Sequence, residues 1–104
     1  MNEKYCQVTV SASNKKQAEK IVQVLCSKRL VAGTLMTEGK SKFWWNNKLI
    51  DKIYFNISCF SVIKKKEAII SEVRKIHEDK CPIIAFSIID GNTELLSWID
   101  KSVG

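Results

Sequence analysis

The side chains with the clearest chemical potential gather around the single histidine of the chain. His77 and Cys81 are four residues apart, and the carboxylates of Glu78 and Asp79 lie between them. Imidazole and thiolate groups are good ligands for copper and zinc, and carboxylates can complete such a set. The spacing is compatible with a copper or zinc site with His77 and Cys81 as ligands, completed by symmetry-related copies. From these residues alone, a surface loop with incidental ligands is the simpler interpretation.

The same residues could form a catalytic pair, with Cys81 as nucleophile, His77 as base and Asp79 as the orienting group. A histidine at the end of a predicted helix has a simpler role, because the helix dipole stabilises its positive charge. A small phosphatase would need glycine and arginine in an anion-binding loop after the first strand, and segment 9–16 (TVSASNKK) contains neither. We therefore expect no enzymatic activity.

The net charge of +6 comes from 17 lysines and arginines against 11 aspartates and glutamates. This excess is compatible with nucleic acid, anionic lipid or an acidic protein partner, and also with a lysine-rich solvated surface, which we favour. The predicted strand IYFNISCF lacks the glycines of RNA-binding strands, and Tyr54 and Phe55 point to opposite faces. No segment approaches the ~20 apolar residues of a membrane span. We expect neither nucleic acid nor membrane as a partner.

The four cysteines are widely spaced and include no Cys-x-x-Cys pair, which argues against a zinc ribbon or a redox motif. Cys6 and Cys59 fall on apolar strand faces, and Cys26 lies on a predicted helix. Buried free thiols are typical of a reducing compartment. The first residues, MNEKYCQVTV, contain no apolar signal region. We therefore expect a cytoplasmic protein.

A long β-hairpin is predicted over residues 41–62, with Asn46 and Asn47 at the turn. Asparagine tolerates the left-handed backbone conformation that tight hairpin turns require. Neighbouring strand residues point to opposite faces, so Trp44 and Trp45 place one large ring on each side. A chain of this length has few residues left to cover both faces. We therefore expect a second copy of the chain to cover one of them.

The remaining periodicities predict a βαββαβ order followed by a short terminal helix. Strands are expected at 5–11, 30–45, 48–62 and 83–89, and helices at 14–29, 64–77 and 93–103. Glycines at positions 33 and 39 predict bulges or bends, and the apolar run 83–89 predicts a strand covered on both faces. The order is that of a single α+β, ferredoxin-like domain over residues 1–104. Both main helices should cover one sheet face and leave the other open for oligomerisation.

This order of motifs resembles the CutA family of divalent-cation-tolerance proteins over residues 5–103. The matching segments include 29–32 (RLVA), 41–45 (SKFWW), His77 followed five residues later by Pro82, and the C-terminal GNTELLSWIDKSV, which is the most specific. The resemblance implies a ferredoxin-like subunit in a tight, PII-like homotrimer whose long hairpins pair across subunits. It also implies a role in tolerance or binding of divalent metals such as copper, without catalysis.

The sequence departs from the family pattern at several polar positions. Gly33 or Ala32 stands where the family has a cysteine, and the family's His-Pro-Tyr is replaced at positions 77–79. His77 is the only carried-over member of a family site. The leading hypothesis is a metal-tolerance protein that binds or senses metal. The alternative is a trimeric scaffold or PII-like regulator that binds a small anion or a protein partner without metal.

Overall fold

The computed structural model describes residues 3–77 and 81–104. The elements follow in the order β1 (Tyr5–Ala12), α1 (Lys15–Ser27), β2 (Gly33–Trp45), β3 (Lys48–Val62), a short 3₁₀ helix (Ile63–Lys65), α2 (Lys66–Ile76), β4 (Ile84–Ile88) and α3 (Thr93–Ser102). The strands form one antiparallel sheet in the order β2-β3-β1-β4, so β2 and β4 are its edges. This arrangement confirms the predicted α+β, ferredoxin-like plan.

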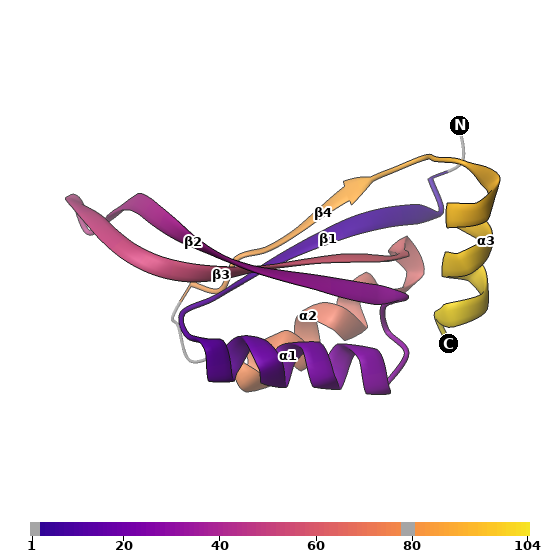
Figure 1. Ribbon diagram of the computed structural model, residues 1–104, viewed down its shortest axis with the longest axis horizontal. Coiled ribbons are helices and arrows are strands. Elements are labelled where there is room, and N and C mark those ends of the chain that lie inside the picture. Colours follow the sequence, from indigo (N-terminus) through magenta and orange to yellow (C-terminus); the bar gives the residue numbers. More distant parts are fainter. Residues whose placement is uncertain (1–2, 78–80) are drawn as a thin grey trace.

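The two main helices pack on the same face of the sheet, as Figure 1 shows. α3 stands at one end of the sheet, and the β2–β3 hairpin extends past the helices at the other end. We call the sheet surface turned away from α1 and α2 the open face. None of the described helices is both long enough and apolar enough to cross a membrane.

The first helix begins where its cap predicts. The Asn14 side-chain oxygen accepts a hydrogen bond from the Gln17 backbone N–H at 2.8 Å, and the Gln17 side-chain oxygen accepts one from the Ser13 N–H at 3.1 Å. The first bond satisfies a backbone donor that the first helical turn leaves without a partner, and the second fixes the residue before the cap. The helix ends at Ser27 with Lys28 as its C-cap residue, and Arg29 then adopts φ of 53°, a left-handed conformation more usual for glycine.

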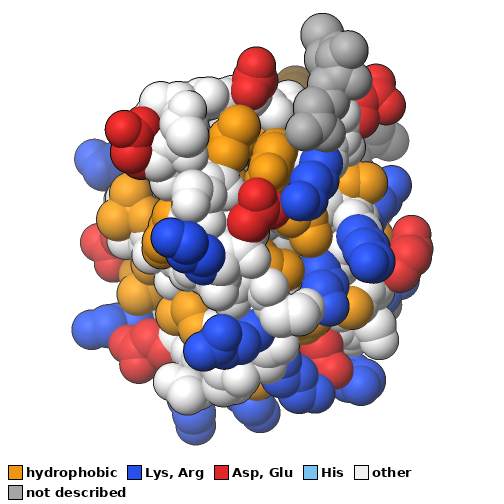
Figure 2. Space-filling model, turned by 90° about the vertical axis from the view of Figure 1, so that its right-hand side faces the viewer, with side chains coloured by type: hydrophobic (Ala, Val, Ile, Leu, Met, Phe, Trp, Pro, Cys, Tyr) orange, Lys and Arg blue, Asp and Glu red, His pale blue; other side chains and the backbone are white. Residues whose placement is uncertain are grey.

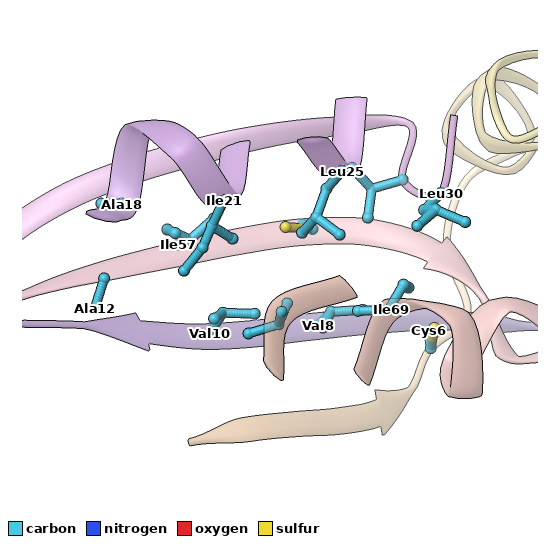
Figure 3. Close-up of a cluster of buried hydrophobic side chains, with 13 residues drawn as sticks. Cys6, Val8, Val10, Ala12, Ala18, Ile21, Leu25, Leu30, Ile57 and Ile69 are labelled. Atoms are coloured by element: carbon cyan, nitrogen blue, oxygen red, sulfur yellow. The ribbon is translucent and has the colours of Figure 1, made fainter. Parts of the chain in front are cut away.

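The core lies between the sheet and the two helices. Alternate residues of β1 are fully buried and face apolar side chains of α1 and α2 (Figure 3). This contact follows from the two-residue period of the strand and the 3.6-residue period of the helices. The buried residues are Cys6, Val8, Val10, Ala12, Ala18, Ile21, Leu25, Leu30, Val31, Ile57, Cys59, Ile69 and Val73.

The hairpin turn has the predicted geometry. Asn46 and Asn47 have φ of 50° and 61°, and Trp45 pairs with Lys48 across this two-residue loop. The predicted bulges in the second strand are wrong, because β2 and β3 pair one-to-one through both Gly33 and Gly39. A Cβ atom at Gly33 would lie 3.0 Å from the Trp98 ring, so close packing of α3 explains the glycine there.

Two further expectations about the strands are wrong. Residues 30–32 form a bend rather than the start of β2, because the Leu30 N–H still donates to the Leu25 carbonyl at the helix end, at 3.0 Å. β4 is also not covered on both faces within one chain. Its helix-facing Phe86 is half-buried, whereas Ala85 is exposed on the open face and Ile83 just before the strand is 56% exposed.

A second, smaller core holds α3 against the sheet around Tyr5, Val62 and Ile99. The Tyr5 hydroxyl donates to the Asp100 carboxylate at 2.7 Å, and the Lys4 ammonium lies 2.7 Å from the other carboxylate oxygen. The hydrogen bond from Lys4, which has the larger effect, and that from Tyr5 hold the pKa of Asp100 below its ordinary value of 3.8. The last helix is therefore held by both apolar packing and charge-assisted hydrogen bonds to Asp100.

Candidate functional site

A groove of about 1130 Å³ runs along the open face towards the projecting hairpin. We call it the hairpin groove. Its aromatic and cationic lining comes mainly from β2 and β3. Its lining also includes Ser11 of β1 and two residues that precede β4, Cys81 and Ile83. Within the described residues, the groove thus joins the hairpin to the region of the predicted metal ligands.

The hairpin side of the groove is rich in aromatic rings. Phe43 and Tyr54 stack edge to face with centroids 5.6 Å apart, and the Lys52 ammonium lies 5.2 Å from the Tyr54 ring centre. Trp44 and Trp45 also line the groove and remain 71% and 42% exposed. Large apolar surfaces of this kind mark sites where a protein binds a partner.

His77 follows the last residue of α2, and its ring is fixed by β1. Its Nε2 lies 2.7 Å from the Ser11 carbonyl oxygen. A carbonyl can only accept, so Nε2 carries the hydrogen, and this tautomer leaves the lone pair of the ring on Nδ1. The sequence did not predict the Ser11 contact, because the two residues are 66 positions apart.

Cys81 is exposed and lines the same groove as Ser11. The Ser11 N–H donates to the carbonyl of Ile83 at 3.1 Å, so the segment that carries Cys81 is attached to the residue that holds His77. The structure therefore brings the two predicted ligands to one region around Ser11. Glu78 and Asp79 lie outside the described residues. Across residues 3–77 and 81–104, no three His, Cys, Asp or Glu side chains gather in a group able to hold a metal, and the His77–Cys81 site stays a prediction.

The four thiols are all free but differ in accessibility. Cys6 and Cys59 are fully buried, and burial raises the pKa of Cys6 above its ordinary value and that of Cys59 to about 12. Such thiols stay protonated at neutral pH and are poor metal ligands. Cys26 and Cys81 are exposed, so thiol chemistry in the folded chain belongs to these two residues.

A second hollow, of about 260 Å³, lies where the ends of α1 and α3 meet. Arg29 and Lys101 line it together with Cys26 and Ser102. Sequence reasoning missed this site because its two cations lie in different helical regions. The only local signal was a basic residue at the end of each predicted helix, which by itself indicates no more than dipole compensation.

Comparison with known proteins matches residues 6–102 to the family described as "CutA1 divalent ion tolerance protein". The divalent-cation tolerance protein CutA of Archaeoglobus fulgidus is 31% identical over 97 residues, which cover 92% of this chain and 95% of that protein. The protein of the same name from Thermotoga maritima is 32% identical over 92 residues, covering 86% of this chain and 90% of that one.

The fold agrees with these matches. The solved structure of the "Periplasmic divalent cation tolerance protein CutA" from Archaeoglobus fulgidus superposes with a TM-score of 0.91 at 29% identity. That match covers 96% of this chain and 99% of the other. The family match, the identity and the shared fold all extend over nearly the whole chain, so this protein belongs to the CutA1 divalent ion tolerance family.

Proposed function

We propose that this protein acts in divalent-cation tolerance as a non-enzymatic homotrimer that binds or senses copper or zinc through His77 and Cys81. The observation that carries the proposal is the arrangement around Ser11. The Ser11 carbonyl holds the His77 ring, and its N–H holds the segment that follows the exposed thiol of Cys81. The names of the curated relatives, which refer to divalent-cation tolerance, support the same role.

The hydrogen bond at Nε2 also has a role in this proposal. Histidines that bind metals usually donate their second ring N–H to a carbonyl or carboxylate, which fixes the tautomer and the orientation of the ring. The Ser11 carbonyl fills that position, so Nδ1 of His77 is the nitrogen that would bind. Together with the Cys81 thiolate it would provide two ligands, and equivalent residues of other subunits would supply the rest.

Exposed apolar side chains on both sides of the β2–β3 hairpin support the proposed trimer. Leu35 on the open face is 66% exposed, and Trp44 and Leu49, which pair on the other side of the hairpin near its turn, are 71% and 50% exposed. A single chain leaves these side chains in water, whereas self-association would bury them. The hairpin is also long enough to extend past its own helices (Figure 1), so it could pair with a neighbouring subunit.

Calorimetric titration with Zn²⁺, and with copper under reducing conditions, tests the metal site. We expect binding tighter than roughly 100 µM, weakened at least about tenfold by either His77→Ala or Cys81→Ala. Cys26→Ala is the matched control, because it removes the other exposed thiol and should leave the affinity unchanged. Absence of binding, or equal affinity in all three variants, would rule out this pair as the ligands.

The charge distribution favours a second candidate, a trimeric scaffold or PII-like regulator that binds a small anion or a protein partner without metal. Ten of the 17 basic residues but only three of the 11 acidic ones lie in segments 13–29 and 63–77, which form the helical layer. Glu72 lies between Lys28 at 2.8 Å and Lys75 at 3.3 Å. The hydrogen bond from Lys28, and to a lesser extent that from Lys75, lowers the pKa of Glu72 below its ordinary value. The helical layer therefore stabilises a negatively charged carboxylate.

The free thiols support a location in the cytoplasm. Burial of Cys6 and Cys59 keeps them as thiols without any disulfide partner, which is the usual state in a reducing compartment. Fractionation of the native host cells, with detection of this chain by mass spectrometry, tests the location directly. Recovery in a cell-surface or periplasmic fraction would contradict it.

A further inference from the structure

The hollow between the ends of α1 and α3 is lined by two cations that form no ion pair within the described chain. Arg29 and Lys101 both line it. Within residues 3–77 and 81–104, neither the Arg29 guanidinium nor the Lys101 ammonium makes an ion pair or a side-chain hydrogen bond. Two positive charges around one small space repel each other. An anion placed between them would attract both and so offset the repulsion.

The position of Arg29 is fixed by its backbone. Its N–H donates to the Cys26 carbonyl at 3.0 Å, and its own carbonyl accepts from the Gly104 N–H at 2.9 Å. The φ of 53° between these two bonds is a conformation that costs energy for a residue other than glycine. The fold thus holds an arginine at a position where the local backbone geometry would favour glycine.

Helix ends alone do not explain this pair of cations. A helix C-terminus carries only about half a negative charge, and its effect fades within the last turn. The end of α1 is already supplied with donors, because the N–H groups of Lys28, Arg29 and Leu30 bond to its last carbonyls. At α3 the Ile99 carbonyl accepts from the Val103 N–H at 3.0 Å. Two full positive charges exceed what these partly satisfied ends require.

We propose that this hollow binds a small oxyanion of the phosphate class, held by Arg29 and Lys101 with the Ser102 hydroxyl as a neutral donor. Guanidinium and ammonium groups give charge-assisted hydrogen bonds to such anions, and a volume of about 260 Å³ accommodates one. The inference rests on the second candidate function and gives it a specific site. It is separate from the metal ligands, because neither His77 nor Cys81 lines this hollow.

Figure 2 shows the end of the molecule at which α1 and α3 finish. Blue side chains gather over its lower part, where the helical layer lies below the sheet in Figure 1. A positive potential over this end would increase the local concentration of anions and so assist their entry.

The exposed thiol of Cys26 lines the hollow and can report on its occupancy. In a Cys81→Ser background, Cys26 is the accessible thiol, since Cys6 and Cys59 are buried. We would measure the rate at which an anionic aromatic disulfide labels Cys26, with and without inorganic phosphate at constant ionic strength. Phosphate should slow labelling by the anionic disulfide about fivefold or more. It should slow labelling by a neutral disulfide less, because the two cations do not attract that reagent.

Direct titration of inorganic phosphate by calorimetry completes the test. Arg29→Gly keeps the left-handed backbone and removes the charge, and Lys101→Gln removes the second charge. Each should weaken phosphate binding about tenfold, whereas Lys15→Gln, which removes an exposed lysine of α1 that does not line the hollow, should have no effect.

Two outcomes would overturn the proposal: no phosphate binding by the parent chain, or equal losses in Lys15→Gln and the two hollow variants, which would indicate only general charge attraction. Titration of the same variants with Zn²⁺ separates this result from the metal proposal. Zinc affinity, whatever its value in the parent chain, should be unchanged in Arg29→Gly and Lys101→Gln, and His77→Ala should leave phosphate binding intact.

Discussion

Replacing Trp44 with alanine should separate the proposed trimer into single chains. Trp44 exposes 71% of its surface in the single chain, on the hairpin that projects beyond the helices. A tryptophan side chain buries about 150–250 Å² when fully covered, so association can remove about 100–180 Å² of this ring from water. At roughly 25 cal/mol per Å², the contribution is about 3–4 kcal/mol for each subunit.

This free energy corresponds to a loss of about 100- to 1000-fold in subunit affinity. Analytical ultracentrifugation from nanomolar to micromolar concentration measures that loss, and light scattering would detect aggregation of the exposed hairpins. Lys42→Ala is the matched control, because Lys42 lies on the same strand and forms an exposed ion pair with Asp51. The reasoning fails if the Trp44→Ala variant keeps the wild-type mass and affinity, or if the wild-type chain is a stable monomer at micromolar concentration.

Two other predictions concern the stability of the subunit. The carboxylate of Asp100, with its lowered pKa, stabilises the fold above its unfolded-state pKa, and this contribution is lost as pH falls through the lower folded-state pKa. The melting temperatures of wild type and Asp100→Asn should therefore differ at pH 7 and converge progressively as the pH falls below ~3.8. Ile57 is fully buried in the main core, so Ile57→Ala should lower the free energy of unfolding, measured in urea, by about 2–5 kcal/mol and Ile57→Val by about 0.5–1.5 kcal/mol. A loss below about 1 kcal/mol for the alanine variant would contradict the packing around Ile57.

Local sequence signals predicted most of the fold because each corresponds to one physical requirement. The helix predicted over residues 14–29 begins with Asn14 and Gln17, a pair at the spacing of a capping box, and the structure shows both side chains bonded at the start of α1. Asn46 and Asn47 indicated a tight turn, and both have positive φ. Apolar residues alternate along β3 after the turn, and this alternation indicates which side faces the helices, because a strand has only two faces.

The errors concern contacts between residues distant in the sequence. Gly33 suggested a bulge, but its small size serves the approach of Trp98, which comes from the last helix. Arg29 carries no local sign of the left-handed conformation that it adopts at the end of α1. The same limitation affects the sites. The sequence identified His77 and Cys81 as ligand types, whereas the hydrogen bonds of His77 and Ile83 to Ser11 are long-range contacts that no spacing rule provides.

The position of β2 at the rim of the sheet has a consequence for the newly synthesised chain. In the single chain its 13 residues present unpaired backbone donors and acceptors along one side, and such an edge can promote aggregation through strand pairing between chains. Lys40 on this strand opposes that process by repulsion between chains, whereas the charge of Lys42 is already paired with Asp51. Concentrated salt screens this repulsion, so freshly refolded protein should precipitate more readily as ionic strength rises.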